Sequence, residues 1–344
     1  MSAMTPQQET THRVEFTGSG GEYFRIWIVN LALTIVTLGI YSAWAKVRRK
    51  RYLCEHTLVD GDFFEYRGNP LAIFKGRMIA VGVVLVIWLA SHFAPALGLA
   101  LLVAAIFVVP WLIVRSFAFN AYNSAYRNVR FHFRGTYGRA LKLFLGYGLL
   151  TVITFGLGWF WLKTRMTEFI VRNHFYGTTQ FDVPNLKPAF FRIYGHVIGL
   201  GILLGALMVG LVGAMAPAMP TIGEEAAQLV PTILGYVGYL FIFAYARAGI
   251  NNALWNQASL GSVRFACTLR AGKLFAIYLV NIVGIILTLG LFTPWAVVRT
   301  LRYRAENLSL IAPGGLGEFT NAVGANVSAA GEEVGEMLDF DFSL

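Results

Sequence analysis

The sequence predicts an all-α polytopic membrane protein with internal repeats and a small cytoplasmic β element between its hydrophobic segments. Three observations predict this fold class: few charged residues, long uncharged runs, and a segment that recurs three times. Of the 344 residues, 56% are hydrophobic and 13% are charged, whereas an average soluble domain carries about 25% charged residues. Much of the folded surface is therefore expected to face lipid.

Long uncharged runs predict the membrane-crossing helices. The run from Met78 to Val114 has room for two crossings, and the runs 193–223 and 226–246 supply a second pair. A spanning helix needs about 20 apolar residues. We therefore predict crossings at about 78–96, 98–116, 194–214 and 228–246.

An internal repeat accounts for the remaining hydrophobic segments. Residues 21–52 and 272–303 align without a gap, and a third copy lies between them. Fixed-period similarity of this kind indicates a repeated structural unit. The positions shared by the three copies are Thr37, Gly39, Trp44 and Arg48; Thr154, Gly156, Trp161 and Arg165; and Thr288, Gly290, Trp295 and Arg299.

These segments divide the chain into five parts. They are a cytoplasmic N-terminal segment (1–22), a first membrane unit (23–119, with repeat segment 23–52 and hairpin 78–116), a second membrane unit (120–261, with repeat segment 139–169 and hairpin 194–246), a third repeat segment (262–304) and an acidic cytoplasmic tail (305–344). The tail is rich in small and acidic residues, a composition typical of disorder.

Short alternating stretches predict the β element. Period-two patterning with aromatic residues is typical of half-buried strands. These stretches are shorter than barrel staves usually are, so we expect a small sheet against the membrane. They are Val14–Phe16, Phe63–Arg67, Val129–Phe133, Gln180–Val183 and Ser262–Phe265.

The positions of the basic residues favour one topology over another. If all seven hydrophobic segments crossed, the basic loops 46–77 and 163–192 would lie on opposite sides, against the positive-inside rule. We favour repeat segments that enter and leave on the cytoplasmic side, each broken at its Thr-X-Gly sequence. A conventional inverted-repeat transporter is the alternative.

One stretch resembles a known family. Residues 37–48 read TLGIYSAWAKVR and follow Phe16-Thr17-Gly18, and this pattern resembles the YjgN-like family of bacterial inner-membrane proteins. The likeness runs from about residue 13 to about 305. The third copy departs from it at Pro294 and Val297. The resemblance implies a multi-pass location in the bacterial inner membrane, and it carries no assigned activity.

The repeat segments contain the candidate functional residues. Asn30 and Asn281 lie in register inside apolar segments, where they either bond neighbouring helices or line a permeation path. Six further residues are candidates for helix breaks or path lining: Thr37, Gly39, Thr154, Gly156, Thr288 and Gly290. The aromatic and basic residues beyond them are candidate interface anchors: Trp44, Arg48, Trp161, Arg165, Trp295 and Arg299.

The composition favours two classes of function, a transporter or a scaffold, and gives no sign of an enzyme. We expect a small-solute or lipid transporter or channel; the alternative is a non-catalytic scaffold that binds anionic lipid or a partner protein through a basic cytoplasmic face. The net charge of +10 fits anionic headgroups rather than nucleic acid. No catalytic, metal or cofactor-binding constellation is visible, so no enzyme is expected. The sequence does not identify the solute, and it is compatible with both a monomer and a homo-oligomer.

Overall fold

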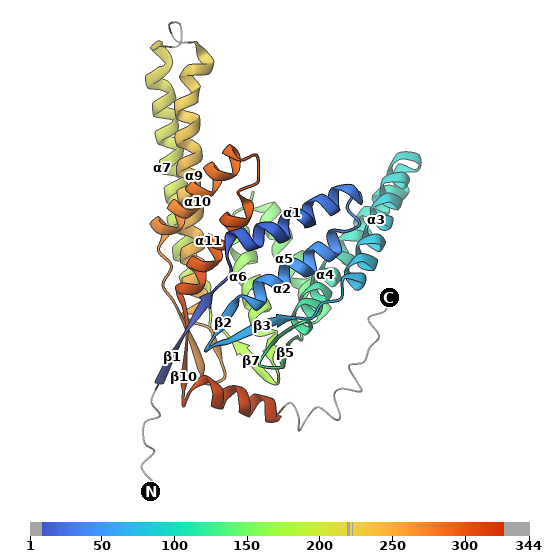
Figure 1. Cartoon of the computed structure of the whole chain (residues 1–344). Helices are drawn as coiled ribbons and strands as arrows, with labels where there is room; N and C mark the ends of the chain where they lie inside the picture. The colour runs from blue at the N-terminus through green and yellow to red at the C-terminus, as the bar shows by residue number, and fades with distance from the viewer. Residues whose placement is uncertain (1–8, 219–220, 222, 327–344) are drawn as a thin grey trace.

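The computed structural model describes residues 9–218, 221 and 223–326. Its centre is a closed antiparallel β-barrel in the order β1-β10-β9-β8-β7-β6-β5-β4-β3-β2 (Figure 1). The strands are β1 (Glu9–Phe16), β2 (Thr57–Val59), β3 (Asp62–Tyr66), β4 (Ser124–Tyr126), β5 (Val129–Phe133), β6 (His174–Tyr176), β7 (Thr179–Asp182), β8 (Ser259–Leu260), β9 (Val263–Cys267) and β10 (Leu308–Pro313).

The barrel corrects the predicted all-α class. Strand β1 pairs with β2 through Val14 and Val59, and with β10 through Thr11 and Ile311. The first and last strands thus close the ring. Closure removes the sheet edges that a small open sheet would leave unpaired. The prediction of an open sheet was wrong because each strand was judged by its length alone.

Sequence patterning found half of the strands. The predicted stretches overlap β1, β3, β5, β7 and β9. The missed strands β2, β4, β6, β8 and β10 contain two to six residues and follow closely on helices. Four of them have two or three residues, which is too short for a period-two signal, and the six residues of β10 (LSLIAP) do not alternate strictly.

Two-residue turns join the strand pairs at one end of the barrel. Asp60 and Gly61 connect β2 to β3 with φ of 53° and 80°. Arg127 and Asn128 connect β4 to β5 with φ of 46° and 62°. Positive φ at both central residues matches the strand twist in tight hairpins.

Five helical hairpins connect the strand pairs at the other end (Figure 1). Each begins and ends at the barrel. The hairpins are α1 (Gly20–Val36) with α2 (Ser42–Glu55), α3 (Pro70–Phe93) with α4 (Pro95–Tyr122), α5 (Tyr137–Ile153) with α6 (Trp159–Arg172), α7 (Lys187–Met215) with α9 (Glu224–Trp255), and α10 (Ala271–Leu287) with α11 (Thr293–Glu306). A 3₁₀-helix, η1 (Ala216–Ala218), follows α7.

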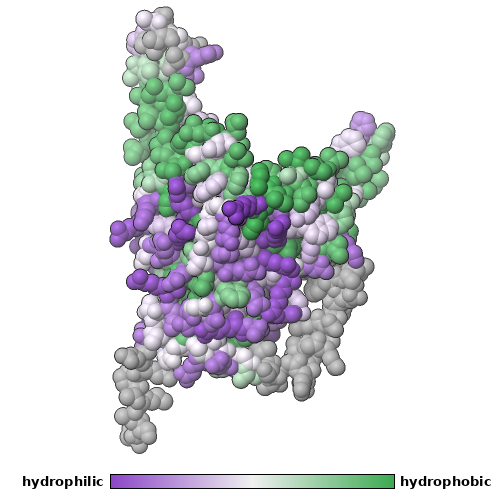
Figure 2. All heavy atoms as spheres, viewed as in Figure 1, coloured by the Kyte–Doolittle hydropathy of each residue, from purple (hydrophilic) through white to green (hydrophobic). Residues whose placement is uncertain are grey.

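The hairpins have two lengths. The helices α3, α4, α7 and α9 are long and apolar enough to cross a membrane, and each overlaps one of the four predicted crossings. The helices α1, α5 and α10 have 17 residues each, or about 25 Å at 1.5 Å per residue, which is less than a bilayer core. Figure 2 shows apolar residues over the outer parts of the hairpins and hydrophilic residues nearer the barrel.

An aromatic ring packs on a glycine where β1 leads into α1 and where β5 leads into α5. The ring of Phe16 lies against Gly18, where a Cβ atom would be 2.8 Å from the ring. Phe133 covers Gly135 in the same way, at 2.5 Å. Glycine is required at these positions because any side chain would collide with the ring.

The C-terminal segment also departs from the expectation of a disordered tail. Residues 308–313 form β10, and residues 316–326 form a helix that lies across the turn end of the barrel (Figure 1). Its residues Leu316 and Val323 are buried in the barrel core. Apolar burial therefore orders this stretch, while residues 327–344 lie outside the described residues.

Candidate functional site

The barrel encloses a cavity of about 270 Å³. Strands from all around the ring contribute side chains, and the helix at 316–326 forms its floor. The lining residues include Val14, Val59, Phe64, Tyr126, Phe131, Tyr176, Phe181, Trp255, Val263, Phe265, Leu310, Leu316 and Phe319. We call this cavity the lumen.

The hydroxyl groups that line the lumen already form hydrogen bonds with backbone carbonyls of the protein. Tyr126 Oη donates to the Val59 carbonyl at 2.7 Å, and Tyr176 Oη donates to the Tyr126 carbonyl at 3.1 Å. Thr57 and Thr320 donate their hydroxyls to the carbonyls of Leu53 and Gly317. The lumen thus presents a hydrocarbon-like surface, and apolar cavities of this kind stay dry.

Burial keeps these phenols neutral. Desolvation raises the pKa of Tyr126 to about 12, and burial likewise raises the pKa of Tyr176. Both groups therefore stay protonated donors over the physiological range.

A second cavity of about 220 Å³ adjoins the lumen on the helix side. It shares Val14, Thr57, Trp255 and Leu308 with the lumen and adds Asn251, Leu301 and Arg304 from α9 and α11. We call it the collar. Within the described residues, the Arg304 guanidinium has no hydrogen bond or ion pair. The collar therefore offers a free positive charge beside an apolar chamber.

A third cavity, the groove, lies between α2, α9, α10 and α11. It has a volume of about 440 Å³ and shares Leu301 with the collar. Asn281 and Thr300 line it together with Arg49 and apolar side chains. Successive cavities thus share lining residues from the apolar helix zone down to the barrel.

The structure separates the two predicted asparagines. Asn281 lines the groove, and its amide donates to the Ala296 carbonyl at 3.2 Å and to Thr300 Oγ1 at 3.1 Å. Asn30 is buried in α1 but is not among the lining residues of the three cavities. The Oδ1 atom of each asparagine is buried without a hydrogen-bond partner. Only Asn281 therefore touches the candidate site.

The six Thr and Gly candidates lie at the tips of the short hairpins, away from the three cavities. Thr288 Oγ1 donates to the Gly284 carbonyl at 2.6 Å and accepts from the Phe292 amide at 2.9 Å. Gly290 has φ of 96°, and its N–H donates to the Ile285 carbonyl at 2.7 Å. The same pattern holds at Thr37 with Gly39 and at Thr154 with Gly156.

This geometry gives hydrogen-bond partners to backbone groups at the point where the two helices of a short hairpin meet. Unpaired backbone groups are costly in hydrocarbon, but the Thr hydroxyl and the Gly N–H pair groups at the helix end. The tips are also apolar: Phe155 is 100% exposed and Leu38 is 94% exposed.

The predicted anchors have varied surroundings. Trp44 packs on Phe74, Trp295 on Phe24 and Trp161 on Phe160. Arg299 lies over the Phe292 ring and Arg48 is exposed. Arg165 pairs with the buried Glu168 at 2.9 Å, so it holds helix α6 rather than standing free.

Sequence reasoning missed the lumen and the collar. Phe131, Phe181 and Phe265 belong to stretches predicted as strands, but their inward faces meet only because the barrel closes. Trp255 and Arg304 gave no local signal beyond their positions at helix ends. Among the described residues, no group of His, Cys, Asp or Glu could hold a metal ion.

A closed barrel carrying apolar helical hairpins, with a hydrocarbon-like lumen, defines a helical membrane protein with a β-barrel base. A family model described as bacterial protein of unknown function (DUF898) matches residues 11–337. The chain belongs to this family of bacterial proteins.

The similar proteins are named as bacterial inner-membrane proteins. The inner membrane protein YjgN of Salmonella typhimurium is 22% identical over 360 residues, covering 89% of this chain and 90% of that protein. The YjgN of Escherichia coli O157:H7 is 32% identical over 124 residues, covering 36% of this chain and 31% of that protein. The predicted resemblance to the YjgN-like inner-membrane proteins is confirmed. No solved structure matches the chain.

Proposed function

We propose that this protein is a multi-pass inner-membrane protein that binds a lipid-like anionic amphiphile. The hydrocarbon tail lies in the barrel lumen and the polar head lies at Arg304 in the collar. The observation that carries the proposal is that the three cavities adjoin one another. The groove and the collar share Leu301, and the collar and the lumen share Val14.

The chemistry of the lumen favours a hydrocarbon over a polar solute. A polar solute would lose water without gaining partners there, since the hydroxyls of Tyr126 and Tyr176 already donate to backbone carbonyls. Burying polar groups without hydrogen bonds is unfavourable. An apolar cavity of about 150 Å³ accommodates benzene, so a cavity of about 270 Å³ has room for a longer hydrocarbon segment.

The charge distribution supports a cytoplasmic barrel. The helices α2, α6 and α11 carry clustered Lys and Arg close to the barrel, whereas the tips at 91–98 and 216–223 carry none. Basic residues are retained on the cytoplasmic side. In this orientation the long hairpins span the bilayer, the short hairpins enter one leaflet, and the groove takes an amphiphile from that leaflet.

Photocrosslinking tests the proposal. Detergent-purified protein is irradiated with a palmitic acid analogue that carries a diazirine near its terminal methyl. We expect adducts on lumen strands β5, β7 and β9. Val14→Trp narrows the boundary between collar and lumen. Because each buried methylene contributes about 0.8 kcal/mol, excluding two of them lowers adduct yield about tenfold.

Glu15→Trp is the matched control, because Glu15 is the next residue of the same strand and is exposed. It is expected to label like the wild type. Equal labelling of both variants, or adducts confined to the helical hairpins, would contradict a lumen site and favour the scaffold alternative.

A further inference from the structure

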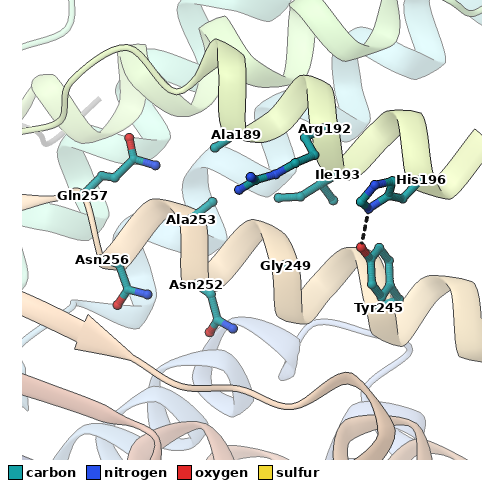
Figure 3. Close-up of a pocket in the computed structure, with 10 residues that line it drawn as sticks. All are labelled: Ala189, Arg192, Ile193, His196, Tyr245, Gly249, Asn252, Ala253, Asn256 and Gln257. Carbon is teal, nitrogen blue, oxygen red and sulfur yellow. Dashed lines mark hydrogen bonds between the residues drawn. The ribbon is translucent and has the colours of Figure 1, made fainter.

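A separate pocket of about 360 Å³ lies between α7 and α9, near the barrel. Arg192, His196 and Tyr245 line it together with Gly249 and Gln257. Figure 3 shows Arg192 reaching from α7 toward the α9 side, and His196 turned toward Tyr245. It shares no lining residue with the lumen, the collar or the groove.

The pocket lies where α7 changes from polar to apolar sequence. Arg192 is the last charged residue before the uncharged stretch 193–223. On α9, Arg247 is the first charged residue after the uncharged stretch 226–246. Charged residues at such boundaries lie at headgroup level when a hairpin spans a bilayer. The pocket is thus at the depth of lipid phosphates.

The free polar side chains of the pocket can each offer an N–H donor: Arg192 and Gln257 do so directly, and His196 does so when Tyr245 donates to its Nδ1. In the part of the chain that the structure describes, the side chains of Arg192 and Gln257 have no hydrogen bond or ion pair. His196 Nδ1 is 2.7 Å from Tyr245 Oη, which orients the ring and leaves Nε2 free. No carboxylate lines the pocket.

The two asparagines of the pocket wall are already engaged. Asn252 exchanges hydrogen bonds with the backbone of Leu269 at 2.8 and 2.9 Å, and Asn256 bonds the backbone of Cys267 in the same way. They fix α9 against the segment before α10. This wall is therefore rigid, and the ligand must meet Arg192, His196 and Gln257.

We propose that this pocket binds the phosphate of an anionic phospholipid from the leaflet next to the barrel. The Arg192 guanidinium supplies two parallel N–H donors to the phosphate oxygens, the geometry for which arginine is suited. His196 Nε2 and the Gln257 amide donate from either side. The acyl chains then lie along the exposed side chains of Leu203 and Leu207, which follow His196 on the same face of α7 after two and three helical turns. This site is independent of the lumen proposed above.

Native mass spectrometry of the detergent-purified full chain tests this site, with dioctanoyl phosphatidylglycerol as the probe. We expect one bound equivalent that Arg192→Gln weakens about tenfold or more, since a bidentate charged contact is lost. Arg192→Lys keeps the charge without the planar fork and is expected to bind at an intermediate level. Dioctanoylglycerol, which lacks the phosphate, should not compete.

Arg247→Gln is the matched control, because Arg247 is an exposed boundary arginine of the same hairpin outside the pocket. It should bind like the wild type. If it loses as much affinity as Arg192→Gln, general surface charge explains the binding and the site is wrong. Displacement of the probe by equimolar inorganic phosphate would also overturn a lipid site.

The test separates this site from the lumen. Diazirine-fatty-acid labelling of the lumen strands should be unchanged in Arg192→Gln. Should that variant not fold, as judged by circular dichroism, Tyr245→Phe gives a second test. It removes the hydroxyl that orients His196, and unchanged probe affinity in it would contradict the proposed role of the histidine.

Discussion

At the scale of single residues, one threonine in each short hairpin holds the chain reversal together. The Thr288 hydroxyl accepts from the Phe292 amide at the start of α11, and it donates to the Gly284 carbonyl, which also accepts the Thr288 N–H. A helix end in hydrocarbon needs such internal partners. This explains why a Thr-X-Gly sequence can stand at an apolar tip.

Replacing Thr288 by valine tests this role. Valine keeps the shape of threonine but loses both hydrogen bonds, so we expect the protein to be less stable by about 1–3 kcal/mol. The measurement is the thermal unfolding midpoint of the detergent-solubilised protein by circular dichroism. Thr288→Ser keeps the hydroxyl and should differ little from the wild type. Equal midpoints for the valine variant and the wild type would contradict the prediction.

At the scale of elements, a polar cluster fastens the helix at 316–326 to the turn end of the barrel. Arg127 donates to Asp60 Oδ2 at 2.9 Å and to Thr320 Oγ1 at 3.2 Å, and His12 Nδ1 lies 2.9 Å from Asp60 Oδ1. Burial raises the pKa of Asp60, but the hydrogen bonds from Arg127 and His12 outweigh it and lower the pKa below the usual 3.8.

A lowered folded-state pKa predicts the direction of a pH effect. The ionised Asp60 stabilises the fold above its unfolded pKa of 3.8, and this contribution is lost as the pH falls below 3.8 through the lowered folded-state value. We expect Asp60→Asn to be less stable than the wild type at neutral pH and to match it at strongly acidic pH. Unfolding midpoints across pH measure this.

The matched control is Glu15→Gln, an exposed carboxylate that forms no ion pair in the described part of the chain. Its unfolding midpoint at neutral pH should stay close to that of the wild type. An Asp60→Asn deficit that persists unchanged at strongly acidic pH would mean that the ionised carboxylate is not what stabilises the cluster.

At the scale of the whole molecule, the barrel turns and the long-hairpin tips lie at opposite ends. Thr178 is in the turn between β6 and β7, and Ala94 joins α3 to α4. Both ends of each hairpin return to the barrel, so the barrel lies wholly on one side of any membrane that the hairpins enter. The basic residues near the barrel predict that this side is the cytoplasm.

Side-specific cysteine labelling tests the orientation. Cys54 and Cys267 are replaced by serine, and Thr178→Cys or Ala94→Cys is introduced. With a membrane-impermeant maleimide, we expect Thr178→Cys to react only after lysis and Ala94→Cys to react in intact cells. Labelling of Thr178→Cys in intact cells would place the barrel outside and invert the proposed orientation.

Much of the architecture was predictable from local patterns. The uncharged runs located α3, α4, α7 and α9, because a 20-residue apolar stretch is a strong local signal. The predicted ends were less accurate: the fourth crossing was predicted at 228–246, and α9 runs from Glu224 to Trp255. The three Thr-X-Gly sequences marked the turns at Thr37, Thr154 and Thr288. Asn281 was singled out as a buried polar residue, and it lines the groove.

Local sequence patterns were enough to find the apolar helices, the recurring hairpin segments and the strands β1, β3, β5, β7 and β9, since hydrophobic periodicity and turn chemistry act over a few neighbouring residues. The barrel and its lumen depend on contacts that form only in the folded chain. Most of the strands have two to five residues and little preference of their own, and the ring closes through pairs such as Thr11 with Ile311 at opposite ends of the chain. Such long-range pairing leaves no local trace, so the cavity lined by Val14, Phe131 and Phe265 exists only once the ring has closed.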